Sequence, residues 1–366
     1  EDSWNLESIS WKFTGFSDQL YVLWNWAYVN VFTKIKTIRR VFFIIYFNKF
    51  FGVYDSNIFI IIIHRVKIII NLTYCIFVDM ISIDKNFKLN SKSYNKRELV
   101  EFASKNIESN YIDLIDLSDF ILEIFNHKSF ILCKTSGTTG NPKVIKLEKA
   151  SLLSSVYMTK DYFNLKSGYS AISFLPINFI AGKMMLVRAM VIGLNLQLNK
   201  ATSNPSDFID RNYFFSAMTP MQASNSINKL KYIDNLILGG SNVSDSLSSK
   251  ILSKIDTYYE TYGMTETATH IAIKRVSKND SKPNNFKVLN GVSISTDLNS
   301  CLVIDVPSIT KNKIITNDIV KINSNQEFYI IGRADNIINS GGVKLIPENI
   351  ERKLSKYIYK NYIISS

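Results

Sequence analysis

Cysteine and histidine are scarce in this sequence, with only three of each among 366 residues. Cys75, Cys133 and Cys301 lie far apart and form no CxxC pair, so the sequence predicts neither a disulfide framework nor a zinc site. A chain without predicted disulfides fits a reducing compartment. We therefore expect a cytoplasmic protein.

Charged residues are also few (20%), whereas 46% of the residues are hydrophobic and 13% aromatic. This balance excludes a mostly disordered chain, and the lack of a Gly-X-Y or heptad repeat excludes a fibrous one. Lys and Arg exceed Asp and Glu by 43 to 31, but the basic residues are scattered. We interpret them as solvated surface, since a nucleic-acid-binding protein, the alternative, would need them on one face.

Residues 1–79 contain no proline and show neither helical nor strand periodicity. Their apolar character suggests a membrane anchor, but Lys49, Asp55 and Arg65 divide the segment, whereas a span needs about 20 mostly apolar residues. The pattern of a signal peptide is missing as well. We interpret the segment as foreign to the domain that follows, which we expect to start at Met80. A membrane-associated binding protein anchored by this segment is the alternative.

From residue 96 onward, helical and strand patterns alternate. The predicted helices are 97–106, 116–126 (with Ser118 as an expected cap) and 150–162. The predicted strands are 129–134, 170–175, 195–198, 214–218, 235–238 and 254–259. Residues 300–306 and 327–331 predict a later antiparallel hairpin. The alternation predicts an α/β fold with a mainly parallel sheet flanked by helices.

A hydroxyl-rich loop directly follows the predicted strand 129–134. It combines two glycines, four hydroxyls and a lysine, in Thr135, Ser136, Gly137, Thr138, Thr139, Gly140 and Lys143. Glycines let the backbone turn tightly, hydroxyls donate hydrogen bonds and lysine adds positive charge, which together suit a polyphosphate. The order differs from the common P-loop, because Gly140 is followed by Asn141 and Pro142. An ordinary Ser/Thr/Gly surface loop is the alternative.

A second pattern ends another predicted strand, in the order Tyr262-Gly263-Met264-Thr265-Glu266-Thr267. An aromatic ring can lie against a base, a threonine can reach a phosphate and a glutamate can hold a divalent cation. Taken alone, these residues fit better a Tyr-rich core strand that ends in a capping turn.

A carboxylate and a guanidinium make the third pattern. Asp318 and Arg333 can converge on the two hydroxyls of a ribose, and Gly341-Gly342 permits close backbone approach. A surface ion pair beside a hairpin is the alternative. The three patterns in one chain together favour a nucleotide site.

In order and spacing over residues 80–349, the three patterns resemble the adenylate-forming acyl-CoA ligases, a family that includes acyl-CoA synthetases, luciferases and peptide-synthetase adenylation domains. Residues 175–188, 218–222 and 262–270 look most like the short-form o-succinylbenzoate-CoA ligases of menaquinone biosynthesis. The resemblance implies an enzyme that uses ATP, Mg²⁺ and coenzyme A. The carboxylate would attack the α-phosphate of ATP to give an acyl-adenylate and pyrophosphate, and coenzyme A would then displace AMP to give the thioester.

The resemblance also implies roles for individual residues. The hydroxyl-rich loop would bind the β- and γ-phosphates of ATP, and the catalytic group would be Lys143, Thr265 and Glu266, with Thr265 at the α-phosphate and Glu266 on Mg²⁺. The remaining nucleotide contacts would come from Gly239, Gly240 and Tyr262 at the adenine, from Asp318 and Arg333 at the ribose, and from Gly263. Asp335 would be the hinge of a small C-terminal domain, with Gly341 and Gly342 approaching the thiol.

For the acid, the resemblance makes Arg188 the partner of a carboxylate of o-succinylbenzoate, with Phe179, Met184 and Met221 as apolar walls. From the residues alone, Arg188 fits a solvated helix position equally well, and Met184 fits plain core. His270 is expected to be structural, because it continues an apolar strand.

We therefore predict three parts: the atypical apolar segment 1–79, an AMP-binding adenylation domain over 80–335, and the start of a truncated small α+β domain over 336–366. Too few residues follow Asp335 for an independent domain, and we expect the family's late catalytic lysine to be missing. The expected partners are a small carboxylic acid and coenzyme A, with no nucleic acid and no membrane. The alternatives are a ligase for another aromatic or fatty acid, and a membrane-associated or nucleotide-binding protein without catalysis.

Overall fold

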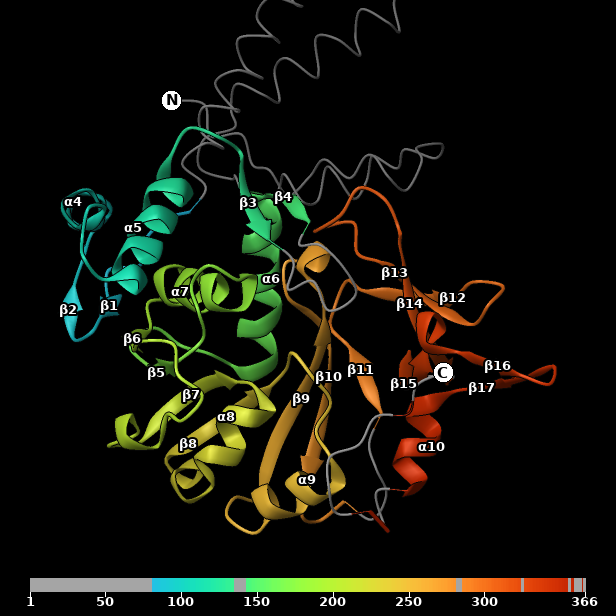
Figure 1. The fold of residues 1–366 in the computed structure, drawn as a ribbon. Helices are drawn as coiled ribbons and strands as arrows, with labels where there is room; N and C mark the ends of the chain where they lie inside the picture. The colour runs from blue at the N-terminus through green and yellow to red at the C-terminus, as the bar shows by residue number, and fades with distance from the viewer. Residues whose placement is uncertain are drawn as a thin grey trace, which may run out of the picture. The chain divides into compact units, whose positions relative to one another are not determined.

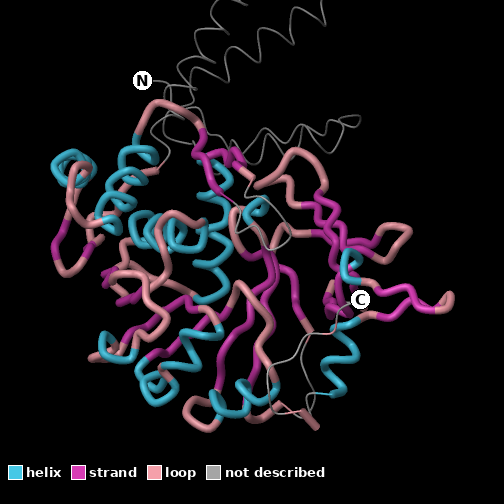
Figure 2. Tube along the Cα trace, viewed as in Figure 1, coloured by secondary structure: helices cyan, strands magenta, loops and turns pink. Residues whose placement is uncertain are grey.

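The computed structural model describes residues 81–134, 143–280, 285–323, 326–354, 357–358 and 364. The predicted segment 1–79 and the loop residues Thr135–Gly140 lie outside these described residues. In the described part, one 13-stranded sheet organises the fold, with the strand order β12-β13-β14-β15-β11-β10-β9-β8-β7-β5-β6-β1-β2 (Figures 1 and 2).

One half of the sheet is parallel. Its strands, in spatial order, are β9 (Thr257–Gly263), β8 (Ile233–Leu238), β7 (Tyr213–Met218), β5 (Ser170–Ser173), β6 (Asn195–Leu198) and β1 (Lys88–Leu89). Every neighbouring pair among them runs parallel, and helical segments connect successive strands from β5 to β9. The carboxyl ends of these strands therefore share one edge of the sheet.

The other half of the sheet is antiparallel. It contains β10 (His270–Ser277), β11 (Phe286–Val288), β15 (Glu327–Arg333), β14 (Ile314–Ile322), β13 (Cys301–Asp305) and β12 (Ser293–Thr296), while β2 (Lys92–Ser93) pairs antiparallel at the far end. The α/β class is confirmed, but the sheet is more mixed than predicted. The hairpin predicted from 300–306 and 327–331 is wrong in its pairing, because β14 lies between β13 and β15 and pairs with both.

Helices cover both faces of the parallel half. The larger apolar core involves α4 (Lys96–Asn106), α5 (Ile112–Phe125), α6 (Lys149–Phe163) and α7 (Ile180–Ile192). The smaller core involves α8 (Pro220–Asn225), the 3₁₀ helix η3 (Ile227–Tyr232) and α9 (Asp245–Leu252). Alternation along β8 links the two, since Ile237 packs into the larger core and Leu236 and Leu238 into the smaller one.

The predicted helix positions agree with α4 and α6, while α5 begins earlier than expected. Asn95 caps α4 in a capping box with Glu98. Helix α5 starts at Ile112, so Ser118 lies buried inside it and its predicted capping role is wrong. Leu117, which precedes Ser118, is buried on the apolar face of α5 together with Phe120 and Ile121. Burial of this face stabilises helical turns before Ser118, so the helix begins earlier than predicted.

The last described elements follow β15 directly. They are the 3₁₀ helix η5 (Ala334–Asn336), the hairpin strands β16 (Ile338–Ser340) and β17 (Val343–Leu345), and α10 (Pro347–Leu354), which contacts β15. Gly341 and Gly342 form the hairpin turn with φ of 58° and 81°, a conformation that glycine adopts without strain. A domain boundary at residue 335 stays a prediction.

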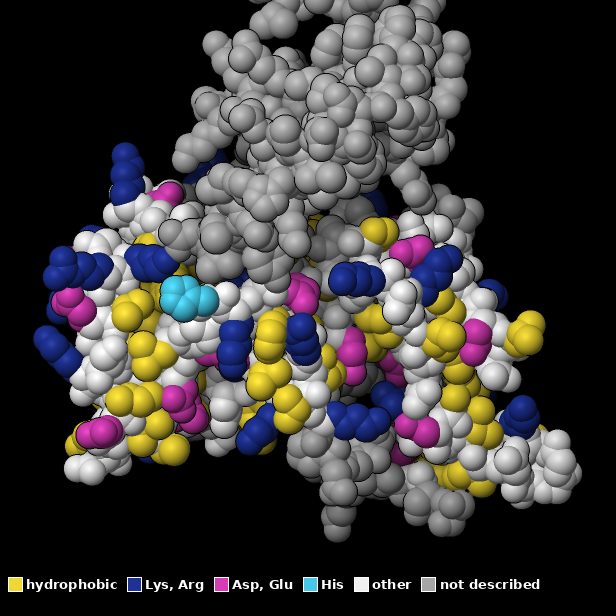
Figure 3. Space-filling model, turned by 90° about the horizontal axis from the view of Figure 1, so that it is seen from above, with side chains coloured by type: hydrophobic (Ala, Val, Ile, Leu, Met, Phe, Trp, Pro, Cys, Tyr) yellow, Lys and Arg dark blue, Asp and Glu magenta, His cyan; other side chains and the backbone are white. Residues whose placement is uncertain are grey.

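The described surface carries mixed charge where it is seen in Figure 3, since Lys and Arg side chains lie among Asp, Glu and apolar ones on that face. In the part of the chain that the structure describes, no helix combines the length and the apolar character needed to cross a bilayer.

A buried ion pair fixes β3 (Phe130–Lys134), which pairs with β4 (Val144–Glu148) in a two-stranded sheet. Glu123 of α5 accepts a hydrogen bond from the Leu132 backbone N–H at 2.7 Å, and Lys183 of α7 donates to the Leu132 carbonyl at 3.4 Å. The two side chains pair with each other at 3.2 Å, and only 9% of Lys183 and 24% of Glu123 are exposed. The pair thus joins two helices to the strand that precedes the hydroxyl-rich loop.

We expect Lys183→Ala to lower the free energy of unfolding by about 3 kcal/mol, because it leaves the Glu123 carboxylate largely buried without its cation. Urea unfolding followed by circular dichroism measures the change. The control is Arg97→Ala, which removes a helical pair with Glu101 whose side chains are 89% and 52% exposed and should cost less than about 0.5 kcal/mol. Equal losses in the two variants would contradict a stabilising role for the buried pair.

Candidate functional site

Most predicted site residues of the described chain gather at the carboxyl edge of the parallel strands. Phe179 follows β5, Met221 follows β7, Gly239 and Gly240 follow β8, and Gly263 ends β9. Ligands of open α/β sheets bind at this edge. The topology therefore brings together residues that are far apart in the sequence.

The turn after β8 is closely packed against its neighbours. The Gly239 N–H donates to the Met218 carbonyl at 3.1 Å, and a Cβ on Gly239 would lie 2.6 Å from the Thr261 hydroxyl. Gly240 has φ of +87°, which glycine adopts easily. On the neighbouring strand end, Thr219 caps α8 in a capping box with Gln222. At Gly239 and Gly240, two of the residues predicted at the adenine, this turn contributes backbone groups and no side chain of its own.

The turn after β9 carries the two residues predicted to act at the phosphates. Thr265 and Glu266 lie half-buried in the 3₁₀ helix η4 (Thr265–Thr267). The Thr267 hydroxyl lies 2.6 Å from the Thr269 carbonyl oxygen and 3.0 Å from that of Met264, and its single proton binds this pair of acceptors and closes the turn. Strand β4, which follows the hydroxyl-rich loop, contacts η4. The strand that follows the hydroxyl-rich loop therefore lies next to the turn that carries Glu266.

Lys143 stands exposed immediately before β4, at the carboxyl end of the hydroxyl-rich loop. The other predicted members of that loop lie outside the described residues. As to a metal, the described residues contain no cluster of three or more His, Cys, Asp or Glu side chains able to hold one. Glu266 alone still fits Mg²⁺ bound to a nucleotide, since that ion is often held by one or two carboxylates together with substrate phosphates.

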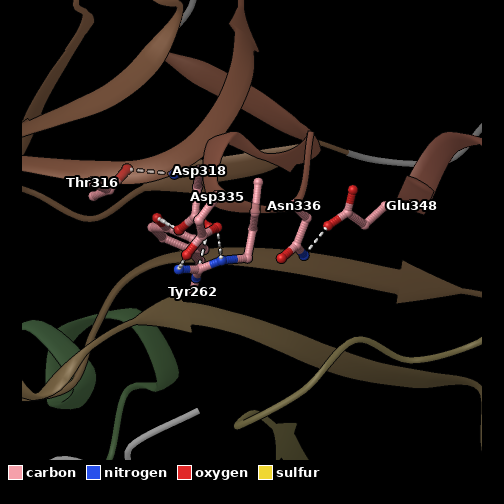
Figure 4. Close-up of polar contacts among 7 residues, drawn as sticks. Tyr262, Thr316, Asp318, Asp335, Asn336 and Glu348 are labelled. Atoms are coloured by element: carbon pink, nitrogen blue, oxygen red, sulfur yellow. Dashed lines mark hydrogen bonds and ion pairs between the residues drawn. The ribbon is translucent and has the colours of Figure 1, made fainter. Parts of the chain in front are cut away.

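The predicted ribose residues Asp318 and Arg333 form an ion pair, and Asp318 lies beside Tyr262, the residue predicted to stack on adenine (Figure 4). The Tyr262 hydroxyl donates to Asp318 Oδ2 at 2.5 Å, and Arg333 NH1 donates to Asp318 Oδ1 at 3.3 Å. Asp318 of β14 and Arg333 of β15 are register partners in the sheet. Burial, reinforced by the Asp318 carboxylate, raises the pKa of the Tyr262 hydroxyl. Tyr262 therefore stays a neutral donor that orients the carboxylate.

Asp335 forms a two-pronged ion pair with Arg333. Both of its oxygens accept from that guanidinium, at 2.9 Å each. These hydrogen bonds lower the pKa of Asp335 and raise the pKa of Arg333. Next to it, Asn336 donates to Glu348 of α10 at 2.6 Å (Figure 4). The predicted hinge residue is thus held by the same arginine that contacts the predicted ribose carboxylate.

Arg188 is buried, which excludes the solvated helix position. Only 2% of it is exposed, and burial lowers the pKa of its guanidinium to about 10. Its described hydrogen bonds go to the hydroxyls of Thr159, at 3.2 Å, and Thr269, at 3.0 Å. None of the described ion pairs involves Arg188. A buried cation whose described partners are neutral suits an anionic ligand.

The apolar residues predicted near the acid fall into two groups. Phe179 and Met221 are exposed to 39% and 60%, whereas Met184 is fully buried core. His270 is buried at the start of β10, as expected of a structural residue. Thr159 and Thr269 were not predicted, because no local pattern in the sequence shows that a threonine of α6 and one beyond η4 meet the same guanidinium.

Comparisons with known proteins agree with this arrangement. The AMP-binding enzyme family model matches residues 123–295. A 2-succinylbenzoate–CoA ligase from Oceanobacillus iheyensis is 21% identical over 69% of this chain and 60% of its own length. The chain thus spans about three fifths of the curated relatives it matches.

Two solved structures show the same fold. An acyl-CoA synthetase (AMP-forming)/AMP-acid ligase II-like protein from Dyadobacter fermentans is 31% identical, with a TM-score of 0.57 over 70% of this chain and 75% of that chain. An o-succinylbenzoate coenzyme A synthetase from Bacillus subtilis, in complex with ATP and magnesium ion, is 20% identical, with a TM-score of 0.54 over 61% of this chain and 54% of that chain.

The family model covers the parallel strands from β5 to β9 and the turns that end them, and the likeness to the Dyadobacter protein covers 70% of this chain. The motifs, the sheet edge that gathers them and these relatives lead to one conclusion: the chain belongs to the AMP-binding enzyme family.

Proposed function

We propose that this chain is an AMP-forming acid-CoA ligase and that its acid is o-succinylbenzoate. The observation that carries the choice of acid is Arg188, a buried guanidinium with neutral described partners next to the turn that holds Thr265 and Glu266. A dicarboxylate can give one carboxylate to this cation while the other reacts with ATP. The names of the Oceanobacillus and Bacillus relatives support the same acid.

In the first half-reaction, a substrate carboxylate oxygen attacks the α-phosphorus of ATP and pyrophosphate leaves. Asp318, oriented by Tyr262 and Arg333, would accept hydrogen bonds from the ribose hydroxyls and so place the α-phosphate. Thr265 would donate to an α-phosphate oxygen. Bound at Glu266, Mg²⁺ would offset negative charge on the phosphates. The described residues thus act by positioning and charge neutralisation.

In the second half-reaction, the thiol of coenzyme A attacks the acyl carbon of the adenylate and AMP leaves. Asp335 is our proposed hinge for the rearrangement between the two steps, because it lies in η5, which connects β15 to the hairpin of β16 and β17. Gly341 and Gly342 would let the backbone of that segment approach the thiol. We further propose a cytoplasmic location, which fits these water-soluble substrates.

A ligase for another aromatic or fatty acid is the second candidate. It is favoured by the exposed apolar side chains of Phe179 and Met221 at the same edge, which suit an acid without a second charge.

Pyrophosphate release decides between the two candidates. With ATP and Mg²⁺ present, we expect turnover with o-succinylbenzoate to exceed turnover with benzoate or a medium-chain fatty acid at least about tenfold, because only the dicarboxylate neutralises Arg188. Equal or faster turnover with the fatty acid would support the second candidate. Failure to bind ATP in a calorimetric titration would contradict both.

The ribose site has its own test. We expect Asp318→Asn to weaken ATP binding about tenfold, because the amide carries no charge and offers Tyr262 and Arg333 one acceptor oxygen instead of two. Isothermal titration with ATP and Mg²⁺ measures the change. The control is Asp305→Asn on β13, which removes an exposed pair with Lys313 at 3.6 Å. Unchanged ATP affinity in Asp318→Asn would remove Asp318 from the ribose site.

A further inference from the structure

Two threonine hydroxyls from different elements hold the guanidinium of Arg188. Thr159 lies on α6 and accepts from Arg188 Nε at 3.2 Å, while Thr269 lies between η4 and β10 and accepts from NH2 at 3.0 Å. An arginine side chain has several rotatable bonds, and two acceptors on separate elements fix both its reach and the plane of its fork. The direction of the guanidinium is therefore set before any ligand arrives.

Proton counting fixes the role of Thr159. Its hydroxyl donates to the Ser155 carbonyl at 3.0 Å, one turn back on α6, so its oxygen can only accept from Arg188. His270 Nε2 lies 3.2 Å from the same oxygen. Burial, with a smaller contribution from the Arg188 charge, lowers the pKa of His270 well below its ordinary value, so the ring is neutral and its Nε2–H donates. Every hydrogen-bonding position of the Thr159 hydroxyl is thereby occupied.

Thr269 ties Arg188 to the turn at the phosphates. It follows Ala268, whose φ of 61° ends the turn that carries Thr265 and Glu266. Its hydroxyl also lies 2.7 Å from the hydroxyl of Ser155. Arg188 is thus fixed relative to both α6 and the predicted α-phosphate contact.

The two hydroxyl partners of Arg188 are uncharged, and this affects which ligand its guanidinium can bind. A carboxylate at either position would neutralise the guanidinium, whereas hydroxyls accept its hydrogen bonds and leave its full charge. Holding such a cation in the interior without an anion is costly, and an incoming carboxylate recovers that cost. The buried guanidinium of Arg188 with its two hydroxyl partners therefore favours binding of an anionic ligand.

We propose that Thr159 and Thr269 are positioning residues that aim Arg188 at the non-reacting carboxylate of the acid and so determine its selection. This inference rests on the proposed function, because it takes the acid to be a dicarboxylate.

The test compares binding of o-succinylbenzoate with binding of 3-benzoylpropionate, which has the same skeleton but lacks the ring carboxylate. Calorimetric titrations use the full chain and the variants Thr159→Val, which keeps the volume without the hydroxyl, and Thr159→Ser, which restores it. We expect Thr159→Val to weaken o-succinylbenzoate binding at least about tenfold, to leave binding of 3-benzoylpropionate and of ATP within about twofold, and Thr159→Ser to recover most of the loss.

A matched control lies on the same helix. Ser154 donates to the Ala150 carbonyl in the same one-turn pattern and is no described partner of Arg188, so Ser154→Ala should leave all three affinities unchanged. If the wild type prefers o-succinylbenzoate and Thr159→Val keeps that preference, the positioning role is wrong while the proposed acid stands. If the wild type binds both acids equally, the choice of acid and the positioning role both fail.

Discussion

The pairing of β9 with β10 is the constraint on which the site depends. Strand β9 runs parallel to β8 and antiparallel to β10, so it belongs to both halves of the sheet. Its carboxyl end therefore meets the start of β10, with Gly263 opposite His270. Only glycine fits at this position, because a Cβ on any other residue would collide with the backbone of Thr269. The connection is a compact turn that contains η4, and it presents Thr265 and Glu266.

The same strand brings the antiparallel half to the nucleotide position. Tyr262 lies one residue before the turn and packs edge-on against Phe328 of β15, with ring centroids 5.2 Å apart. Its hydroxyl reaches Asp318 on β14, whose other oxygen meets Arg333. Tyr262, at the end of a parallel strand, thus fixes the position of the Asp318 carboxylate, 56 residues further along the chain. Precise positioning of this kind is what a reaction governed by alignment of its substrates requires.

Local patterns predicted the elements well where apolar runs ended in clear breakers, as for β6 and α6, whose residues agree closely with the predicted ranges. The Asp318–Arg333 contact was also predictable, since a short stretch of chain separates the two. Helix α7 was harder, because it is buried nearly all round and has no apolar stripe to show its bounds. The partners of Arg188 were beyond prediction, since they depend on how α6, α7 and the turn before β10 pack.

The ion pair of Glu123 and Lys183 has a consequence for behaviour at high concentration. A two-stranded sheet such as β3–β4 has an open side, and the outward N–H and C=O groups of such a strand can recruit a strand from another molecule. At Leu132 both groups are already taken by the two side chains. At this residue of β3, therefore, neither backbone group is free to pair with a strand of another molecule.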